Sequence, residues 1–401
     1  MGTTSPIQKQ LRFISLFAGC GGLDLGFIQE GFQNIGAFDI DANALKVHHH
    51  NLQSPTFVHD LLNGLPSSFG RPRAEVLLAG APCQGFSTLG KRLLDDPRNN
   101  LLVEAGKLAV CLSPDIFVAE NVPAVLSGPH RKYWKALDEV LRSAEYKTMQ
   151  IVCDATHHGV SQTRRRVFLI AWRGRAEINL QIPARRSGIL RDVISNINGA
   201  LNHNLRPIPK GSQELLIAKR IGPGQKLSNA RGGARAVHTW DIPEVYGRTS
   251  SGERKVLELI LHLRRRERIR AWGDADPLPM SRLHREFGKA IIDTLARKGY
   301  LRRLGTNIDL TNTFNGKYRR LSWDEPSKTV DTRFGSARYY LHPSEHRGFT
   351  VREAARIQGF PDSYHFLGSE SHQFQMIGNA VPPPLARCVA AAIRGTFFSL
   401  P

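Results

Sequence analysis

The sequence predicts an α/β fold, with a doubly wound and mostly parallel sheet followed by a smaller, irregular and basic region. From residue 11 to about residue 172, short apolar runs alternate with helix-like segments, as in βαβ units whose helices cover both faces of a parallel sheet. After residue 173 the alternation stops, and the chain to about residue 322 is rich in Arg, Gly, Pro and Asn. A chain of 401 residues with 41% hydrophobic residues can bury a core large enough for two domains.

The expected elements of the first region follow from local patterns. Strands are expected where short apolar runs end in polar or Gly-containing turns, and helices where apolar residues recur at helical spacing. The expected strands are 12–17, 34–39, 56–59, 75–79, 116–120, 147–154 and 166–172, and the expected helices are 23–30, 42–50, 100–112 and 133–143.

The middle of the chain contains one better-defined block. Helices are expected over 254–270, 281–287 and 289–298, and 299–310 resembles a hairpin that turns at Gly305-Thr306-Asn307. Three helices and a hairpin indicate a winged-helix-like unit over 254–310, although a generic helical subdomain fits the pattern equally well.

Strong patterning returns at the C-terminus. Thr350 and Glu353 have the spacing of a capping box before a helix that reaches residue 357. A run of three prolines precedes a long apolar helix over 385–397, whose composition suits packing back on the sheet. We therefore expect domains over 11–173 and 174–325, and a segment over 326–401 that returns to the first domain.

The charge of the chain is strongly basic and unevenly distributed. It has 55 Lys and Arg against 35 Asp and Glu, a net charge of +20, and residues 174–330 alone hold 30 basic against 15 acidic residues. Such a region usually meets a polyanion, most often nucleic acid, although some basic faces are merely solvated. No apolar run approaches the roughly 18 residues of a membrane span, so we expect a cytoplasmic protein.

The cysteines and histidines do not predict a metal site. The five cysteines are widely spaced and contain no Cys-x-x-Cys pair, so neither a disulfide framework nor a zinc site is supported. Three histidines, His48 to His50, are consecutive, and consecutive residues of a helix do not share a face. We interpret them as a polar helix face.

Glycine and aspartate at the ends of the first strands predict a nucleotide-type pocket. Gly19, Gly21 and a third glycine form the turn between the first strand and its helix, where glycine permits a tight bend and close approach of a ligand. Asp39 ends the second strand, where a carboxylate can accept both hydroxyls of a ribose, and Asp60 ends the third. The glycine spacing matches neither dinucleotide nor phosphate loops, so S-adenosylmethionine fits best. Strand-end aspartates also cap helices, and Asp41 is a candidate for that.

A cysteine and an acid follow the next two strands. Cys83 lies on a loop after the apolar run 75–79, and Glu120 ends the run 116–119. The carboxyl ends of neighbouring parallel strands converge, so a thiol and a carboxyl could face one pocket, attack a ring carbon and protonate a ring nitrogen. Arg164 and Arg166 would point the same way from an extended segment and could hold a carbonyl or phosphate oxygen. A buried inert cysteine and a solvated basic edge are the alternatives.

Taken in order, these motifs resemble the C5-type DNA cytosine methyltransferases of bacterial restriction-modification systems. The matching segments run from residue 13 to residue 390 and leave only the middle uncovered. They are Phe17-Ala18-Gly19-Cys20-Gly21-Gly22, Gly80-Ala81-Pro82-Cys83-Gln84-Gly85-Phe86-Ser87, Glu120-Asn121-Val122, Gln162-Thr163-Arg164-Arg165-Arg166, Arg352-Glu353-Ala354-Ala355-Arg356-Ile357-Gln358-Gly359-Phe360-Pro361 and Gly378-Asn379-Ala380-Val381-Pro382.

The resemblance implies an S-adenosylmethionine-dependent methyltransferase fold, with catalysis and cofactor binding in 11–173 and target recognition in 174–325. It implies that the cofactor contacts Phe17, Gly19, Gly21, Asp39, Ile40, Asp60, the backbone of Leu101, and Asn379. Ile40 stands where the family often has a large aromatic residue, so stacking on the adenine would rest more on Phe17.

The chemistry implied by the resemblance acts on a cytosine flipped out of double-stranded DNA. Cys83 would add to C6 as a thiolate, Glu120 would hold N3 and the exocyclic amine, and Arg164, with Arg166 beside it, would hold O2. C5 would then take the methyl group before its proton and Cys83 leave.

Further contacts and partners follow from the same resemblance. Residues 87–100 match a mobile loop that closes over DNA, with contacts from Ser87, Lys91, Arg92 and Arg98, and Gln162 joins this set. We expect a monomer that acts beside a restriction endonuclease cutting the same sequence.

Two other functions fit the sequence less well. One branch of the family methylates transfer RNA and carries a Cys-Phe-Thr signature, but no cysteine of this chain is followed by Phe-Thr. A transcriptional regulator built on the winged-helix-like block would need no intact catalytic residues, whereas Cys83, Glu120 and Arg164 are all present.

Overall fold

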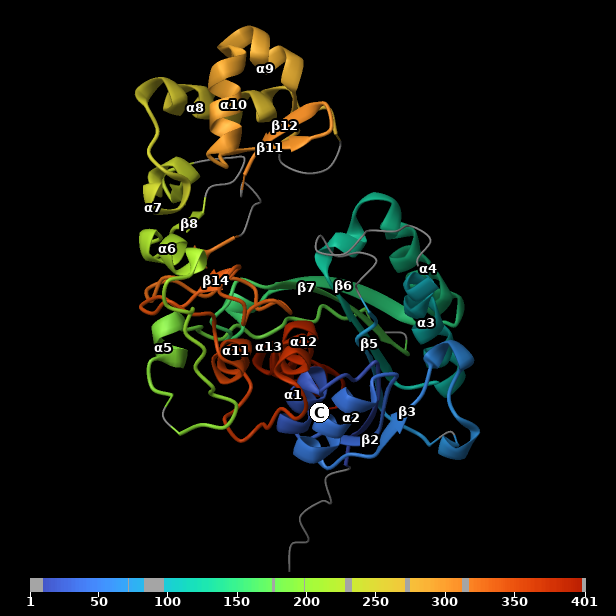
Figure 1. The fold of residues 1–401 in the computed structure, drawn as a ribbon. Helices are drawn as coiled ribbons and strands as arrows, with labels where there is room; N and C mark the ends of the chain where they lie inside the picture. Colours follow the sequence, from blue (N-terminus) through green and yellow to red (C-terminus); the bar gives the residue numbers. More distant parts are fainter. Residues whose placement is uncertain are drawn as a thin grey trace, which may run out of the picture. The chain divides into compact units, whose positions relative to one another are not determined.

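The computed structural model describes residues 10–70, 72–82, 97–174, 177–197, 199–227, 233–270, 275–311 and 317–398. The chain forms two compact units (Figure 1). The first unit comprises Met1–His203, Pro326–Thr332 and Val351–Pro401, and the second comprises Asn204–Glu325 and Arg333–Thr350. No helix of the described residues is long and apolar enough to cross a membrane.

The first unit is built on one seven-stranded sheet of order β3-β2-β1-β4-β5-β7-β6. The first five of these strands pair in parallel, and β7 pairs antiparallel with both β5 and β6. The predicted fold class, a doubly wound and mostly parallel sheet, is confirmed. The strands are β1 (Arg12–Leu16), β2 (Gln33–Asp39), β3 (Thr56–Val58), β4 (Val76–Ala79), β5 (Ile116–Asn121), β6 (Lys147–Asp154) and β7 (Arg165–Trp172).

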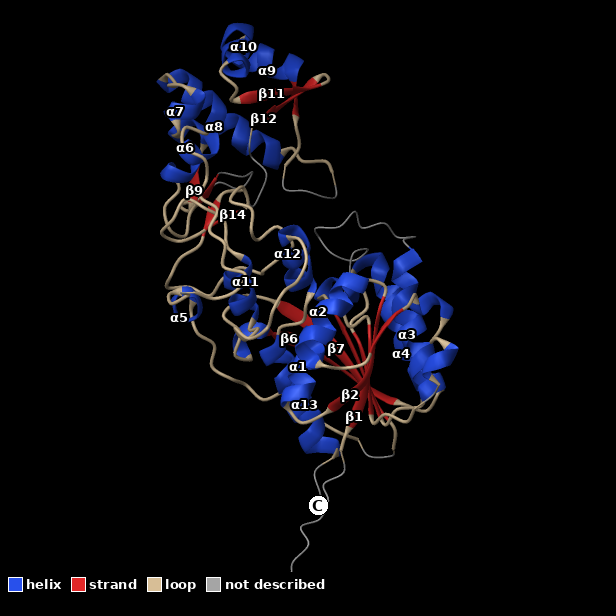
Figure 2. Cartoon of the chain, turned by 60° about the horizontal axis from the view of Figure 1, so that its bottom comes forward, coloured by secondary structure: helices blue, strands red, loops and turns tan. Residues whose placement is uncertain are grey.

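Helices cover both faces of this sheet (Figure 2). Phe13 and Ile14 are neighbours on β1 but belong to different apolar clusters, because successive residues of a strand point to opposite faces. One cluster is closed by α3 and α4 and the other by α1 and α13. The helices of this unit are α1 (Gly22–Gln29), α2 (Ala42–Leu52), α3 (Leu101–Leu112), α4 (Arg131–Ser143), α5 (Leu190–Ile194), α11 (Val351–Gln358), α12 (Glu370–Asn379) and α13 (Pro383–Phe397).

The C-terminal helix α13 packs tightly on α1. A Cβ atom added at Gly26 would lie 2.4 Å from the Cβ atom of Ala386, so the two helices meet at a position that only glycine permits. Leu385 and Val389 of α13 are fully buried in the same cluster as Phe27 of α1. The last helix of the chain therefore completes the core of the first unit.

The boundaries of the two units differ from those expected. Residues 177–197 and 199–203 belong to the first unit, because Leu180 is buried in the sheet cluster and the amide of Asn202 donates to the carbonyl oxygen of Phe366 at 3.0 Å. Residues 333–350 belong to the second unit, where β14 pairs in parallel with β13. A change in composition at residue 173 marked the end of the sheet, and the unit continues beyond it.

The second unit contains short elements around its own apolar cluster. Its helices are α6 (Gln213–Arg220), α7 (Pro243–Tyr246), α8 (Ser251–Arg266), α9 (Met280–Phe287) and α10 (Lys289–Arg297). Its strands are β8 (Lys226–Leu227), β9 (Ala236–Val237), β10 (Leu278–Pro279), β11 (Leu301–Leu304), β12 (Asn307–Leu310), β13 (Arg319–Arg320) and β14 (Tyr340–Leu341).

Single 3-10 turns occur in both units. They lie at Leu61–Asn63, Ser67–Phe69, Pro97–Asn100, Pro123–Leu126, Gly128–His130, Ala155–His157 and Thr239–Asp241.

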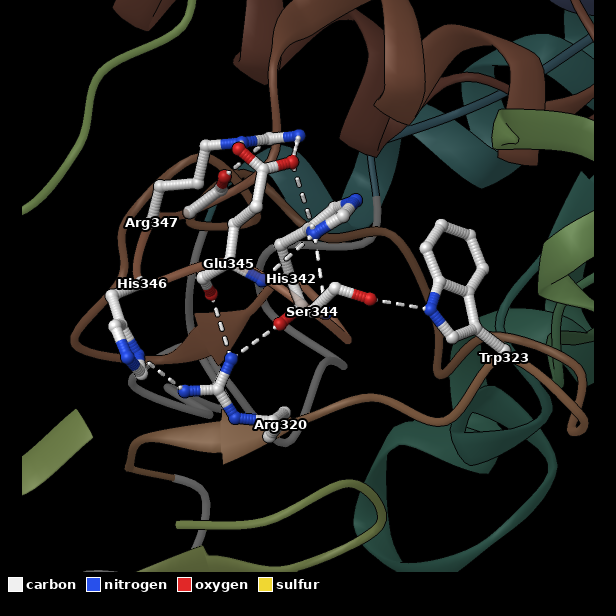
Figure 3. Close-up of polar contacts among 8 residues, drawn as sticks. Arg320, Trp323, His342, Ser344, Glu345, His346 and Arg347 are labelled. Carbon is white, nitrogen blue, oxygen red and sulfur yellow. Dashed lines mark hydrogen bonds and ion pairs between the residues drawn. The ribbon is translucent and has the colours of Figure 1, made fainter. Parts of the chain in front are cut away.

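The guanidinium of Arg320 joins its own strand to two other segments of the second unit. Figure 3 shows its contacts with the segment that contains His342, Glu345 and His346. The residue is 3% exposed, and all three nitrogens of its guanidinium donate to the protein. Burial lowers the pKa of Arg320, and the hydrogen bonds compensate the buried charge. The acceptors are the carbonyl oxygens of Ala218 (2.8 Å), Ile221 (2.6 Å), His342 (2.6 Å) and Glu345 (2.7 Å) and Nδ1 of His346 (2.9 Å).

We predict that Arg320→Ala lowers the free energy of unfolding by at least about 3 kcal/mol, because four buried carbonyl oxygens lose their donor. Arg319→Ala is the matched control, since Arg319 is the preceding residue of the same strand and is only half-buried. Urea unfolding followed by circular dichroism measures both. Equal stabilities of the two variants would contradict the structural role of Arg320.

Candidate active site

The residues expected to carry chemistry follow strands that end at one edge of the sheet. The cofactor loop follows β1, Asp39 ends β2, Asp60 follows β3 and Glu120 lies at the end of β5. Because these strands are parallel, their carboxyl ends lie along one edge, where ligands of such sheets bind.

The carboxylate of Asp39 accepts a hydrogen bond from the turn after β1. Its Oδ2 accepts the backbone N–H of Gly19 at 2.8 Å, and its Oδ1 accepts the backbone N–H of Asp41 at 2.8 Å. Phe17 has φ 56° and Gly19 has φ 55°, so both residues take the left-handed conformation that this bend requires. No atom of the described residues lies within 4 Å of the point where a Cβ of Gly19 would stand, so among these residues its backbone faces open space.

Gly21 has different surroundings from Gly19. A Cβ atom there would lie 2.7 Å from Cδ1 of Leu52 and 2.8 Å from Cδ2 of His48, and its φ is 88°. Its N–H donates to the carbonyl oxygen of Ala18 at 3.0 Å. Glycine at this position is therefore explained by the packing of the turn, and its contact with a cofactor stays a prediction.

The other expected cofactor residues have varied exposure. Ile40 is 70% exposed directly after Asp39. Asp60 accepts the N–H of Leu62 and caps a 3-10 turn. Leu101 is the buried first residue of α3, and Asn379 is the exposed last residue of α12.

Helix capping by strand-end aspartates also occurs here. Oδ1 of Asp41 accepts the N–H of Asn43 at 3.0 Å and the N–H of Ala44 at 3.1 Å, and Asp41 is the N-cap of α2. The histidine run that begins on this helix is not a uniformly polar face, because His48 is fully buried and its Nε2 lies 2.7 Å from Oδ2 of Asp24. The described residues contain no group of three His, Cys, Asp or Glu side chains placed to hold a metal ion.

Three residues that the sequence analysis missed support the cofactor loop. The hydroxyl of Tyr364 donates to the carbonyl oxygen of Cys20, and Sγ of Cys20 lies 3.6 Å from the carbonyl oxygen of Met376. Asp24, fully buried behind the turn, accepts from Ser15 at 2.7 Å. No local pattern could have found these contacts, because the first two join residues more than 300 positions apart.

Glu120 and Arg166 form a buried ion pair. Nε of Arg166 lies 2.7 Å from Oε1 of Glu120, and both side chains are mostly buried. Burial raises the pKa of Glu120, and the positive charges of Arg166 and Arg164 oppose that shift in part. A carboxyl group with a raised pKa holds its proton more readily at neutral pH, so it can act as a proton donor.

Arg164 does not share the position of Arg166. Its guanidinium is 2% exposed and donates to the carbonyl oxygens of Val330, Gly378 and Ala380, each at 2.9 Å. The expectation that Arg164 holds a substrate oxygen is therefore corrected, because backbone oxygens occupy its two terminal nitrogens. β7 begins at Arg165, so Arg164 lies before the strand, and the alternation of an extended segment does not place it on the face of Arg166.

The expectation that Gln162 contacts DNA is also wrong. Its side chain is 0% exposed, and its amide donates to the carbonyl oxygen of Ile357 at 3.2 Å and to the side-chain oxygen of Gln358. Its Oε1 accepts the N–H of Val330 at 3.0 Å. Gln162 fixes the start of β7 against the C-terminal segment and is unavailable to a ligand.

Four residues of the predicted site lie outside the described part of the chain. These are Cys83, Ser87, Lys91 and Arg92, and the side chain of Arg98 is likewise not described. The segment that leads to Cys83 is fixed, because the amide of Asn121 donates to the carbonyl oxygen of Ala81 at 3.2 Å. Among the described cysteines, burial raises the pKa of Cys20 to about 12 and that of Cys153 to about 11, so neither forms a thiolate readily.

The fold and the strand-end residues together define the class of S-adenosylmethionine-dependent methyltransferases. The model of the C-5 cytosine-specific DNA methylase family matches residues 11–395, and the chain belongs to this family. Its cofactor is S-adenosylmethionine, and the residues fit it: Gly19 exposes backbone to open space, and the carboxylate of Asp39 lies beside that space.

Curated relatives cover nearly the whole chain. The chain is 31% identical over 395 residues to the type II methyltransferase M.XorII of Xanthomonas oryzae, covering 95% of this chain and 84% of that protein. It is 30% identical over 409 residues to the type II methyltransferase M.DdeI of Desulfomicrobium norvegicum, covering 96% of this chain and 89% of that protein.

Solved structures share the fold at lower identity. The structure of a protein described as a prophage-encoded DNA modification methyltransferase (E. coli) has a TM-score of 0.61 at 22% identity, covering 97% of this chain and 100% of that one. The methyltransferase EhMeth of Entamoeba histolytica has a TM-score of 0.59 at 15% identity, covering 98% of this chain and 100% of that one.

We predict that Asp39→Asn weakens S-adenosylmethionine binding about 10- to 100-fold, because an amide cannot accept both backbone N–H groups and a ribose hydroxyl. Asp138→Asn on α4 is the control, since Asp138 pairs with Arg142, one turn further along the same helix, at the surface. Calorimetric titration with S-adenosylmethionine measures both dissociation constants. An unchanged constant for Asp39→Asn would rule out the ribose contact.

We predict opposite outcomes for the two arginines. Arg164→Met lowers the free energy of unfolding by about 3–5 kcal/mol, because three carbonyl oxygens lose a charged donor. Arg166→Met costs less stability but lowers the methylation rate at least about 100-fold, because Glu120 loses its partner. Unfolding titrations and methyl-transfer assays measure the two effects.

The pH dependence of stability gives a second test of this pair. The folded-state pKa of Glu120 is raised, so stability falls as pH rises above the ordinary carboxyl pKa and levels off above the folded-state pKa. Without the charge of Arg166 the folded-state pKa rises further, and the fall in stability continues to higher pH. Identical pH profiles for the wild type and Arg166→Met would contradict the ion pair.

Proposed function

We propose that this chain is the modification enzyme of a type II restriction-modification system, which methylates C5 of one cytosine within a short duplex DNA sequence. The observation that carries the chemistry is the buried pair of Glu120 and Arg166 at the end of β5. Relatives that span nearly the whole chain are type II methyltransferases, which supports the biological setting.

In the proposed reaction the cytosine is flipped out of the duplex, because its ring carbons are unreachable within the stack. Cys83 as a thiolate forms a bond to C6, and the π electrons of the C5=C6 double bond move toward C5 and, by conjugation, N3. Glu120 donates its proton to N3, which its raised pKa favours. Arg166, rather than Arg164, lies beside that carboxyl group to hold O2.

S-adenosylmethionine would supply an electrophilic methyl group: as C5 forms the new carbon–carbon bond, the bond between the methyl carbon and the sulfonium sulfur would break and leave S-adenosylhomocysteine. A base then removes the C5 proton, whose electron pair restores the C5=C6 double bond as the bond between C6 and Cys83 breaks. N3 returns its proton to Glu120, and the ring regains its aromaticity. Asp39 and the turn at Gly19 orient the cofactor in this proposal, with Phe17, Ile40, Asp60, Leu101 and Asn379 as the further contacts.

Recognition of the DNA sequence belongs to the second unit in this proposal. The second unit, residues 204–325 and 333–350, carries twice as many basic as acidic residues, 28 against 14, which suits contact with phosphates. The protein would act in the cytoplasm as a monomer bound to DNA, and methylation would protect the sequence that a cognate endonuclease cuts.

The proposal predicts one methylated sequence context. Expression in a host without cytosine methylation, followed by bisulfite sequencing of the genome, should show 5-methylcytosine in a single short shared context. Cys83→Ser is the control variant, and it should lower methyl transfer by at least about four orders of magnitude while DNA binding persists. Genomic DNA without 5-methylcytosine would overturn the function, and full activity of Cys83→Ser would overturn the mechanism.

A further inference from the structure

The second unit contains a block with the element order of a winged helix (Figure 1). Along the chain it runs α8, β10, α9, α10, β11 and β12. Its three strands form one sheet of order β10-β12-β11, so the short strand between the first two helices pairs with the last strand of the hairpin. A generic helical subdomain does not require that pairing.

Within this block α9 and α10 form a helix-turn-helix. The single residue between them is Gly288, which has φ 88° and whose N–H donates to the carbonyl oxygen of His284 at 2.9 Å. A residue with a side chain would be strained there, so glycine sets the sharp turn. Leu283 of α9 and Ile292 and Leu295 of α10 are fully buried in one cluster with α8 and the hairpin.

The other face of α10 is turned away from the core. Lys289, Ala290 and Arg297 are exposed, and Asp293 and Thr294 are half-buried. These five positions recur at helical spacing and form one face opposite Ile292 and Leu295. The face has no large apolar side chain, and small and hydrogen-bonding residues of this kind fit the edges of base pairs in a major groove.

The charge of this surface favours a polyanion. Residues 280–304, from α9 to the end of β11, contain seven Lys and Arg and two Asp and Glu. Asp293 is neutralised by Arg303 of β11, whose Nη2 lies 2.8 Å from the carboxylate. Within the described part of the chain, Arg285, Lys289 and Arg297 form no ion pair.

We propose that α10 is the recognition helix of this protein, which enters the major groove and reads part of the methylated sequence. This inference rests on the proposed function for the identity of the DNA. Lys289, Ala290 and Thr294 face the base edges near the start and middle of the helix, as in other helix-turn-helix units. Arg285 at the end of α9 and Arg297 at the end of α10 contact phosphates.

The first experiment separates phosphate contacts from folding. The double variant Arg285→Ala/Arg297→Ala should weaken binding of the full-length protein to a short duplex with the mapped sequence at least about 10-fold. The slope of log affinity against log salt should fall by about two, because each lost phosphate contact removes about 0.9. Lys132→Ala/Lys135→Ala on α4 removes the same charge from another exposed helix and should change neither value.

The second experiment tests base reading. Lys289→Ala and Thr294→Ala should each relax at least one fixed position of the methylated context in the bisulfite map, with unchanged far-UV circular dichroism. Unchanged contexts in both variants, together with wild-type affinity and salt slope in the arginine variant, would overturn the proposal.

Failure of the proposed function would look different. A wild-type protein that leaves the genome unmethylated would refute the function alone. Selection of bound duplexes from a pool with a random centre would then decide the inference, because an intact recognition helix still enriches a sequence that the Lys289→Ala variant does not enrich. Enrichment of the same sequence by both proteins would overturn it.

Discussion

The guanidinium of Arg164 is the interaction on which the geometry of the first unit depends. Arg164 is the residue that precedes β7. Its guanidinium donates to the carbonyl oxygens of Val330, Gly378 and Ala380, which lie 166, 214 and 216 positions further along the chain. Gln162 makes a parallel set of contacts from the same segment. A buried guanidinium is costly unless its donors are satisfied, so these segments must come together when the unit folds. This closure holds Asn379, between two of the three acceptors, in the same unit as the cofactor loop.

Burial has the opposite consequence for Glu120. The guanidinium of Arg164 stays charged, and the dipoles of the backbone carbonyl groups stabilise it. The carboxyl group of Glu120, in contrast, avoids the desolvation cost of a buried charge when it keeps its proton. Its partner Arg166 reduces the shift without cancelling it, because the net direction of the pKa is upward. The same burial that costs stability at higher pH thus favours the protonated carboxyl group, which is the form that the proposed proton transfer to N3 requires. This is the exchange of stability for reactivity expected at a functional site.

The sequence predicted what depends on local pattern. The seven strands, the cap at Asp41 and the hairpin before Leu310 were found because alternation, capping residues and turn glycines act over a few positions. The separate roles of Arg164 and Arg166 were not predicted from the sequence. They depend on the partner of each guanidinium, which is a set of backbone carbonyl oxygens for Arg164 and the carboxylate of Glu120 for Arg166. The prediction that Gln162 contacts DNA was wrong for the same reason. A polar residue in a motif suggests contact with a ligand, and the sequence does not show that its side chain is buried. The limits of the two units were also missed, since residues 333–350 join the second unit through β14 and the contacts of Arg320.

In the second unit, the residues that form the core are different from the residues proposed to contact DNA. Its core is formed by residues such as Leu257, Ile292 and Leu295, and Arg320 ties its distant segments together. The outward residues of α10 belong neither to this core nor to the contacts of Arg320. Substitutions at Lys289 or Thr294 therefore change the surface proposed to contact DNA without opening a cavity. The ion pair of Arg303 with Asp293 links the hairpin to that surface. On the proposed function, a recognition surface supported by an independent core can therefore change its target while the proposed chemistry at Glu120 stays constant.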